Sequence, residues 1–205
     1  MADTAGKAPG GGGQVDLGGA ARRVAELAAG VGEGRLADPT PSPGMAVRNL
    51  LGHLVGLSQG FQYAARKERT EHTGRSPAAT VPDVDDDGAW RDELPLLLDG
   101  LAEAWRDPAA WEGMTQIGGV ELPGGQAGLV ALNELVVHGW DLARSTGQPY
   151  DAEPAELDLC RELLAASVEQ RPIPGLFDVA VEVPPDAPLL DRVIGLSGRD
   201  PSWRP

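Results

Sequence analysis

The sequence predicts an all-α protein, a four-helix bundle with short additional helices and a small extended segment near the C-terminus. Apolar residues recur every three or four positions over four long stretches, which is the spacing of one face of an amphipathic helix. Segments rich in proline and glycine separate these stretches. Strict alternation of apolar and polar residues, which indicates a strand, is confined to a few positions. These observations together favour helices packed around one core.

The long helices are expected at residues 15–31, 45–67, 87–107 and 125–145. The first two are separated by a connector, 38–44, that holds three prolines and so cannot be helical. The second helix carries Gly52, Gly56 and Gly60, each of which weakens a helix by roughly 1 kcal/mol relative to alanine. Close approach of a neighbouring backbone or a ligand beside His53 would compensate for that cost.

Shorter elements fill the rest of the chain. Residues 109–123 contain Gly118–Gly119 and indicate a turn or short hairpin, and 154–169 should form a fifth helix. A weak alternation over 177–183 indicates an extended strand, and 189–196 should form a last short helix. The polar stretch 70–86 is expected to be an irregular loop.

The chain is expected to form one domain, residues 14–205, after a disordered tail, residues 1–13. The tail is too poor in apolar residues to bury a core. The remaining length suits a single domain. A homodimer is compatible with this size, although no apolar stripe demands one.

Charge and cysteine content exclude several classes of partner. The net charge is −14 and the pI is near 4.5, so the surface repels phosphate backbones and anionic lipid. We therefore expect neither nucleic acid nor membrane partners. Cys160 is the single cysteine, which excludes an internal disulfide and fits a reducing cytoplasm. No apolar run is long enough for a membrane span, and no secretory signal is recognisable.

Two side chains on the fourth helix point to metal chemistry. Glu134 and His138 are four residues apart, which puts both on one helix face. His53 lies in another mostly apolar helix, and the chain has only 3 histidines. A buried imidazole needs a partner, and a shared divalent cation would provide one. His53, Glu134 and His138 are therefore predicted metal ligands, although a histidine on an apolar face is more often an ordinary core residue.

Two imidazoles and one carboxylate suit zinc, iron(II), manganese or nickel, with open positions for water or substrate. Asp141 follows His138 by three residues and stays on the same face. It could orient a ligand or polarise a bound water. The alternative is that Asp141 pairs with Arg144 or caps a neighbouring loop.

Other candidates favour ordinary structural roles. Residues 83–88 begin like a calcium-binding loop, but Leu94 stands where the bidentate Glu is required, so capping of a helix by Asp86 or Asp87 is preferred. His72 lies in a polar segment and is expected to be exposed. Cys160 falls on an apolar helix face and is expected to be a core thiol.

Several segments resemble the DinB-like metal-binding superfamily, in the actinobacterial branch related to mycothiol-dependent maleylpyruvate isomerase. They are Asp-Pro-Thr-Pro-Ser-Pro at 38–43, the segment 47–56 around His53, the segment 134–149 and the C-terminal segment 183–203. The resemblance covers about residues 15–205. This chain has Gly44 and Met45 where the family pattern usually has an acidic residue and Trp, which leaves the substrate's shape open.

The resemblance implies a four-helix core and a metal triad that maps onto His53, Glu134 and His138. Relatives join a low-molecular-weight thiol, mycothiol or bacillithiol, to an electrophile, or use the thiol to isomerise a double bond. By this analogy the metal is most readily zinc and the cosubstrate mycothiol. Arg144 could then hold a substrate carboxylate, or it could simply form a surface salt bridge.

Three hypotheses follow for the function. The first is a metal-dependent thiol transferase or isomerase that acts on a small electrophile, with catalytic roles for Asp141 and Arg144. The second is metal-assisted hydrolysis of a small molecule, with Asp141 as a base for a metal-bound water. The third is a bundle that binds a metal or small molecule without catalysis.

Overall fold

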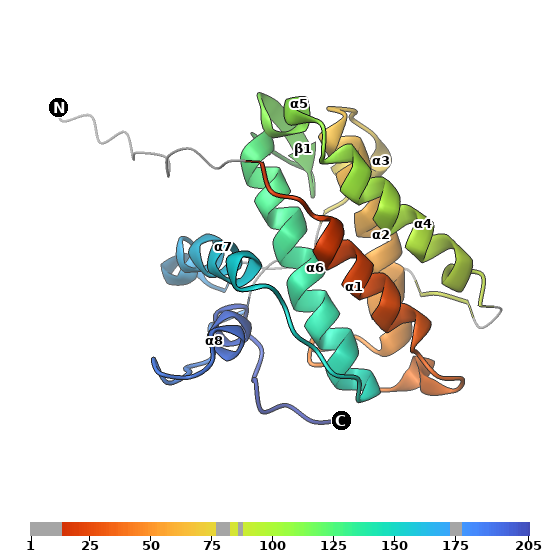
Figure 1. The fold of residues 1–205 in the computed structure, drawn as a ribbon, viewed down its shortest axis with the longest axis vertical. Coiled ribbons are helices and arrows are strands. Elements are labelled where there is room, and N and C mark those ends of the chain that lie inside the picture. Colours follow the sequence, from red (N-terminus) through yellow and green to blue (C-terminus); the bar gives the residue numbers. More distant parts are fainter. Residues whose placement is uncertain (1–13, 77–82, 86–87, 173–177) are drawn as a thin grey trace.

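The computed structural model of the chain describes residues 14–76, 83–85, 88–172 and 178–205. Within these ranges the long helices are α1 (Gly18–Ala29), α2 (Val47–Ala65), α4 (Trp90–Ala104) and α6 (Gly124–Thr146). The structure confirms the all-α bundle, and Figure 1 shows the four long helices side by side. Both α1 and α2 pack against α4 and α6, so α1 and α2 occupy opposite corners of the bundle.

Short elements complete the described chain. They are η1 (Arg35–Ala37), α3 (Glu71–Gly74), α5 (Pro108–Trp111), β1 (Met114–Ile117), β2 (Val120–Pro123), α7 (Pro154–Ala165), η2 (Val168–Gln170) and α8 (Leu189–Leu196). Helix α7 packs against α6 and α8 packs against α7, outside the bundle (Figure 1). None of the helices in the described ranges is long and apolar enough to cross a membrane.

Helix α6 is the most enclosed element because the bundle covers one side and α7 covers another. Most of its side chains are buried, including the polar groups of His138, Asp141 and Ser145. The helix begins after Pro123 and ends at Gly147, whose φ of 72° is the left-handed conformation that commonly closes a helix. Such enclosure explains the length of the apolar stretch in the sequence.

Leucines fill the core between the four helices. Those that are fully buried include Leu50, Leu51, Leu54, Leu94, Leu98, Leu101, Leu132, Leu135 and Leu142. Trp105 closes one end of the core, where its Nε1 donates a hydrogen bond of 3.1 Å to the Phe61 carbonyl oxygen. A buried indole N–H usually has such a partner, because an unpaired one would reduce the gain from burying the ring.

The predicted hairpin within 109–123 is confirmed. Strands β1 and β2 pair antiparallel, with Ile117 opposite Val120 across the turn. The hairpin is fixed to the end of α2, because Thr115 Oγ1 donates a 2.6 Å hydrogen bond to the Ala64 carbonyl oxygen. It also contacts α3, where the Gly119 amide donates to the Thr73 carbonyl oxygen at 2.9 Å.

Three expectations were wrong in part. The stretch 70–86 is not irregular throughout, since α3 forms where Thr70 and Thr73 cap each other through reciprocal side-chain hydrogen bonds. The fifth helix ends at Ala165, and η2 follows it. No strand occurs at 178–183 in the described chain; instead the Val181 amide donates to the Gly195 carbonyl oxygen at 2.9 Å, along α8.

The glycines of α2 do not share one environment. A Cβ at Gly56 would meet open space, whereas a Cβ at Gly60 would lie 3.1 Å from Ile117 Cδ1 and 3.4 Å from the His72 carbonyl oxygen. Close backbone approach therefore applies to Gly60, beside the hairpin and α3, and does not apply to Gly56. The expected tail 1–13, the caps at Asp86 and Asp87, and Phe177 lie outside the described residues.

Candidate metal centre

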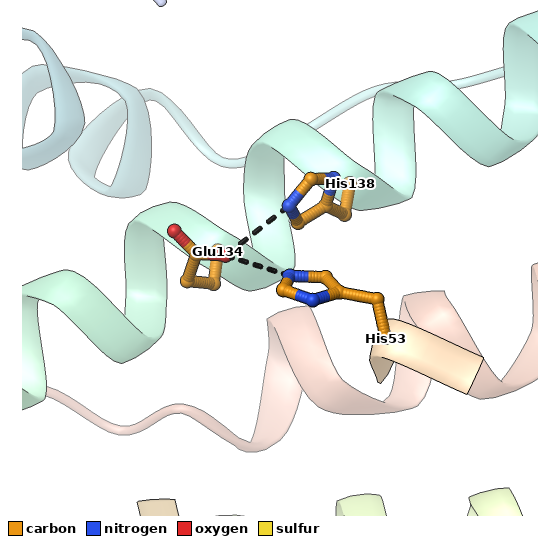
Figure 2. A group of neighbouring side chains, drawn as sticks. All are labelled: His53, Glu134 and His138. Atoms are coloured by element: carbon orange, nitrogen blue, oxygen red, sulfur yellow. Dashed lines mark hydrogen bonds and ion pairs between the residues drawn. The ribbon is translucent and has the colours of Figure 1, made fainter. Parts of the chain in front are cut away.

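Helices α2 and α6 bring the three predicted ligands together. Glu134 Oε2 lies 3.3 Å from His53 Nε2 and 3.1 Å from His138 Nε2 (Figure 2). One ligand atom from each residue can be chosen so that all three lie within 4.8 Å of one another. In the part of the chain that the structure describes, no other group of three His, Cys, Asp or Glu side chains has this geometry. The expected convergence of residue 53 with residues 134 and 138 is therefore found.

The centre is partly exposed to solvent. The His138 side chain is 9% exposed, whereas Glu134 and His53 are 21% and 31% exposed. The two imidazole rings meet edge to face, with centroids 4.7 Å apart and an interplanar angle of 75°. A cation held by these groups would be least accessible beside His138 and most accessible beside His53.

Charge at the centre is set by the contacts between the three side chains. Burial by itself would raise the pKa of Glu134, but hydrogen bonds from His138 and His53 outweigh burial and hold this pKa well below its ordinary value. Burial would likewise lower the pKa of His138, but hydrogen bonds to Asp141 and Glu134 raise it to about 9. Glu134 is therefore an ionised carboxylate, the form that binds metal.

Asp141 lies behind His138, on the side away from Glu134. Its Oδ2 is 2.9 Å from His138 Nδ1, and its side chain is fully buried. When the imidazole is neutral, this contact favours a proton on Nδ1 and leaves the Nε2 lone pair facing Glu134 and His53. Of the two roles expected for Asp141, the contacts match the one that orients a ligand.

The cation that balances Asp141 is Arg199, which the sequence did not single out. Arg199 Nη2 lies 3.1 Å from Asp141 Oδ2, and Arg199 Nε lies 3.4 Å from Oδ1. Burial would raise the pKa of Asp141, but the positive charge of Arg199 and the contact with His138 lower it. Arg199 and His138 therefore favour the ionised carboxylate although its side chain is fully buried.

Arg144 does not pair with Asp141, so that expectation was wrong. Its Nη2 donates a 3.0 Å hydrogen bond to the Pro201 carbonyl oxygen, and its guanidinium carbon lies 5.3 Å from the centre of the Trp140 ring. These contacts attach α6 to the C-terminal segment. The proposed contact of Arg144 with a substrate carboxylate stays a prediction.

The remaining candidates are structural. His72 is half-buried rather than exposed, because its ring stacks on Tyr63 with centroids 5.6 Å apart. Cys160 is buried in the core as expected, and burial raises the pKa of its thiol to about 12. In residues 83–85, Asp83 accepts a hydrogen bond from Asn49 Nδ2 near the start of α2.

The donor set of two imidazole nitrogens and one carboxylate oxygen is a common three-residue set for a divalent metal. The family model described as the mycothiol maleylpyruvate isomerase N-terminal domain matches residues 17–143, more than half of the chain. The chain belongs to this family. No curated protein and no solved structure gave a match.

The range that matches the mycothiol maleylpyruvate isomerase N-terminal domain ends within α6. It includes His53, Glu134, His138 and Asp141 and excludes Arg199. Helices α7 and α8 also lie beyond it. Arg199, the positively charged partner of Asp141, therefore lies outside the matched domain.

Proposed function

We propose that this protein is a metal-dependent enzyme that catalyses the reaction of a low-molecular-weight thiol with a small electrophile, as an S-transferase or an isomerase. The observation that carries the proposal is the convergence of ligand atoms from His53, Glu134 and His138 within 4.8 Å at a partly exposed site. Membership of the mycothiol maleylpyruvate isomerase N-terminal domain family supports mycothiol as the thiol.

The proposed ligands are His53 Nε2, Glu134 Oε2 and His138 Nε2. Zinc is the preferred metal because it accepts nitrogen, oxygen and sulfur ligands and has no redox chemistry of its own, while iron(II), manganese and nickel also suit these donors. When bound, such an ion would supply Lewis-acid chemistry and lower the pKa of a coordinated thiol from about 8.5.

The residues of the chain provide position and access. Glu134 brings the negative charge, and Asp141 orients His138 through Nδ1. The exposed sides of His53 and Glu134 leave an approach for thiol and substrate. In an addition reaction, the sulfur would form a bond to one carbon of an activated alkene, the π electrons would move to the other carbon, and that carbon would take up the proton released by the thiol. In a displacement, the sulfur would form a bond to carbon as the leaving group departs with the bonding electrons. A reducing cytoplasm, which the single cysteine fits, would keep such a thiol available.

Hydrolysis is the second hypothesis, and the geometry disfavours its proposed base. Asp141 is fully buried, is paired with Arg199, and touches the nitrogen of His138 that faces away from Glu134. A carboxylate in that position does not reach a water at the open side of the centre. Glu134 is itself a proposed ligand.

The test uses full-length protein loaded with zinc and incubated with mycothiol and a panel of activated alkenes and alkyl halides. We expect thiol consumption above the uncatalysed rate with wild type and loss of the catalysed rate in His53→Ala. Arg204→Gln is the control, since Arg204 is exposed and donates only to nearby backbone carbonyls in the described structure.

The same protein is assayed in parallel for hydrolysis of a panel of esters and amides. If they are hydrolysed while thiol consumption stays at the background rate, the transferase proposal is wrong and the hydrolase hypothesis replaces it. If zinc binds but no substrate in either panel reacts, the third hypothesis, binding without catalysis, replaces both.

A further inference from the structure

A continuous series of polar contacts runs from the open centre into the C-terminal segment. Glu134 Oε2 is 3.1 Å from His138 Nε2, and His138 Nδ1 is 2.9 Å from Asp141 Oδ2. That same oxygen is 3.1 Å from Arg199 Nη2. Asp141 is fully buried and the Arg199 side chain is 13% exposed, so water does not compete effectively for these contacts.

The end of α8 places Arg199 in this position. Gly198 has a φ of +88°, and the backbone amides of Gly198 and Arg199 donate to the carbonyl oxygens of Gly195 and Ile194 at 3.0 and 3.2 Å. This pair of hydrogen bonds is a Schellman motif, in which the glycine conformation reverses the chain. Arg199 Nη1 also donates to the Ser197 carbonyl oxygen at 3.0 Å. The backbone of Arg199 is therefore fixed by the end of α8, and its guanidinium is held by the Ser197 carbonyl oxygen as well as by Asp141.

The position of Asp141 depends on this guanidinium. A buried carboxylate without a cation is unfavourable, and the side chain relieves that cost by moving or by admitting water. Movement of the side chain would take Oδ2 away from His138 Nδ1, and an admitted water would compete with His138 for Oδ2. The imidazole would then lose the partner that fixes its ring orientation, which is a known determinant of metal affinity.

We infer that Arg199 is a positioning residue of the metal centre, which acts through Asp141 to hold His138, and that the C-terminal segment beyond residue 143 is part of the site. The inference rests on the proposed metal binding by His53, Glu134 and His138, and it is independent of which reaction the metal serves. The competing explanation is that Arg199 only attaches the C-terminal segment to α6.

The two explanations differ in what Arg199→Gln changes. A positioning role predicts weaker metal binding, whereas simple attachment predicts lower stability with unchanged metal affinity. The probe is Zn²⁺ added to metal-free, full-length protein, with affinity measured by competition against a chromogenic chelator. Circular dichroism and the melting temperature of each metal-free variant show whether it is folded.

We expect Arg199→Gln to lower Zn²⁺ affinity by about 10- to 100-fold, the range typical for partners of metal ligands. Asp141→Asn should lower it by a similar factor. The double variant should be no weaker than Asp141→Asn alone, because Arg199 acts through Asp141. Arg199→Lys retains the charge and should recover part of the affinity. Arg204→Gln should match wild type.

Unchanged or tighter Zn²⁺ binding by folded Arg199→Gln would overturn the inference and leave the proposed function intact. So would additive losses in the double variant. If Arg199→Gln does not fold, Arg199→Lys and Asp141→Asn carry the test, and wild-type affinity in both would overturn the inference. Failure of wild type to bind Zn²⁺ would instead overturn the metal site, and with it the proposed function.

Discussion

Glu134 Oε2 lies between two imidazole nitrogens, at 3.3 Å from His53 and 3.1 Å from His138. The cost of a partly buried carboxylate is offset by these two partners, which also lower its pKa. At the scale of single residues, the candidate centre is thus a group of mutually dependent side chains. Removal of Glu134 would leave both Nε2 atoms without this partner, whereas removal of either histidine would leave Glu134 with a single imidazole contact.

Cys160 is the opposite case, an ionisable side chain that is expected to be unreactive in the folded protein. It is buried in the core, and burial raises the pKa of its thiol from 9.0 to about 12. We expect folded protein to resist iodoacetamide at pH 7.5 and at pH 9.5, because neither the thiolate nor access is available. Intact mass after timed exposure measures the labelling.

Protein unfolded in urea is the control and should be labelled rapidly, increasingly so as the pH rises through 9. Because the folded state holds the thiol neutral, its contribution to stability is present below the unfolded pKa and declines as the pH rises from about 9 toward 12. Rapid stoichiometric labelling of folded protein at pH 7.5 would show that Cys160 is reactive and contradict this account.

The sequence predicts the three ligands but does not predict Arg199, the positively charged side chain that pairs with Asp141. Glu134 and His138 share a helix, so their spacing of four residues determines their relative position, and the few histidines leave little choice for the third ligand. Arg199 lies 58 residues beyond Asp141 in the chain. Its contact depends on how α8 packs, and local spacing carries no signal that separates it from other arginines.

Element boundaries were predictable where proline or glycine ends a helix. Gly147 ends α6, and Pro154 begins α7, both close to the expected positions. Helix α3 was missed because four residues are too few for a helical period to be visible. The alternation in the described part, 178–183, does not mark a strand: Val179 and Val181 are exposed, and the Val181 amide donates to the Gly195 carbonyl oxygen of α8 instead of to a neighbouring strand.

The glycines of the long helices allow a direct test of packing. A Cβ at Gly128 in α6 would lie 2.6 Å from Trp111 Cζ3 and 2.9 Å from Trp105 Cζ3. We expect Gly128→Ala to lower the free energy of unfolding by about 1–3 kcal/mol, since the cost of overpacking exceeds the roughly 1 kcal/mol gained in helix propensity. Urea unfolding of metal-free protein, followed by circular dichroism, measures the change.

Gly56→Ala in α2 is the matched control, because a Cβ there meets open space. It should raise the free energy of unfolding by about 0.5–1 kcal/mol. A Gly128→Ala protein as stable as Gly56→Ala would mean that the two indoles do not pack against α6 as described.

At the scale of the whole molecule, the bundle and the C-terminal segment meet at α6. The bundle supplies the three proposed ligands, and the segment after α8 supplies Arg199, which holds the carboxylate behind one of them. The family match covers the first contribution and not the second. We therefore expect residues 17–143 to hold the three ligands and Asp141 but to lack Arg199, the charged partner of Asp141.

The central claim is that α2 and α6 together hold one divalent metal ion. The most direct measurement is elemental analysis, by inductively coupled plasma mass spectrometry, of full-length protein purified without chelator. The account predicts about one equivalent of a divalent transition metal, zinc foremost, in wild type and a small fraction of that in folded His53→Ala. A wild-type protein without metal that also fails to take up added Zn²⁺, or a His53→Ala protein with full metal content, would contradict it.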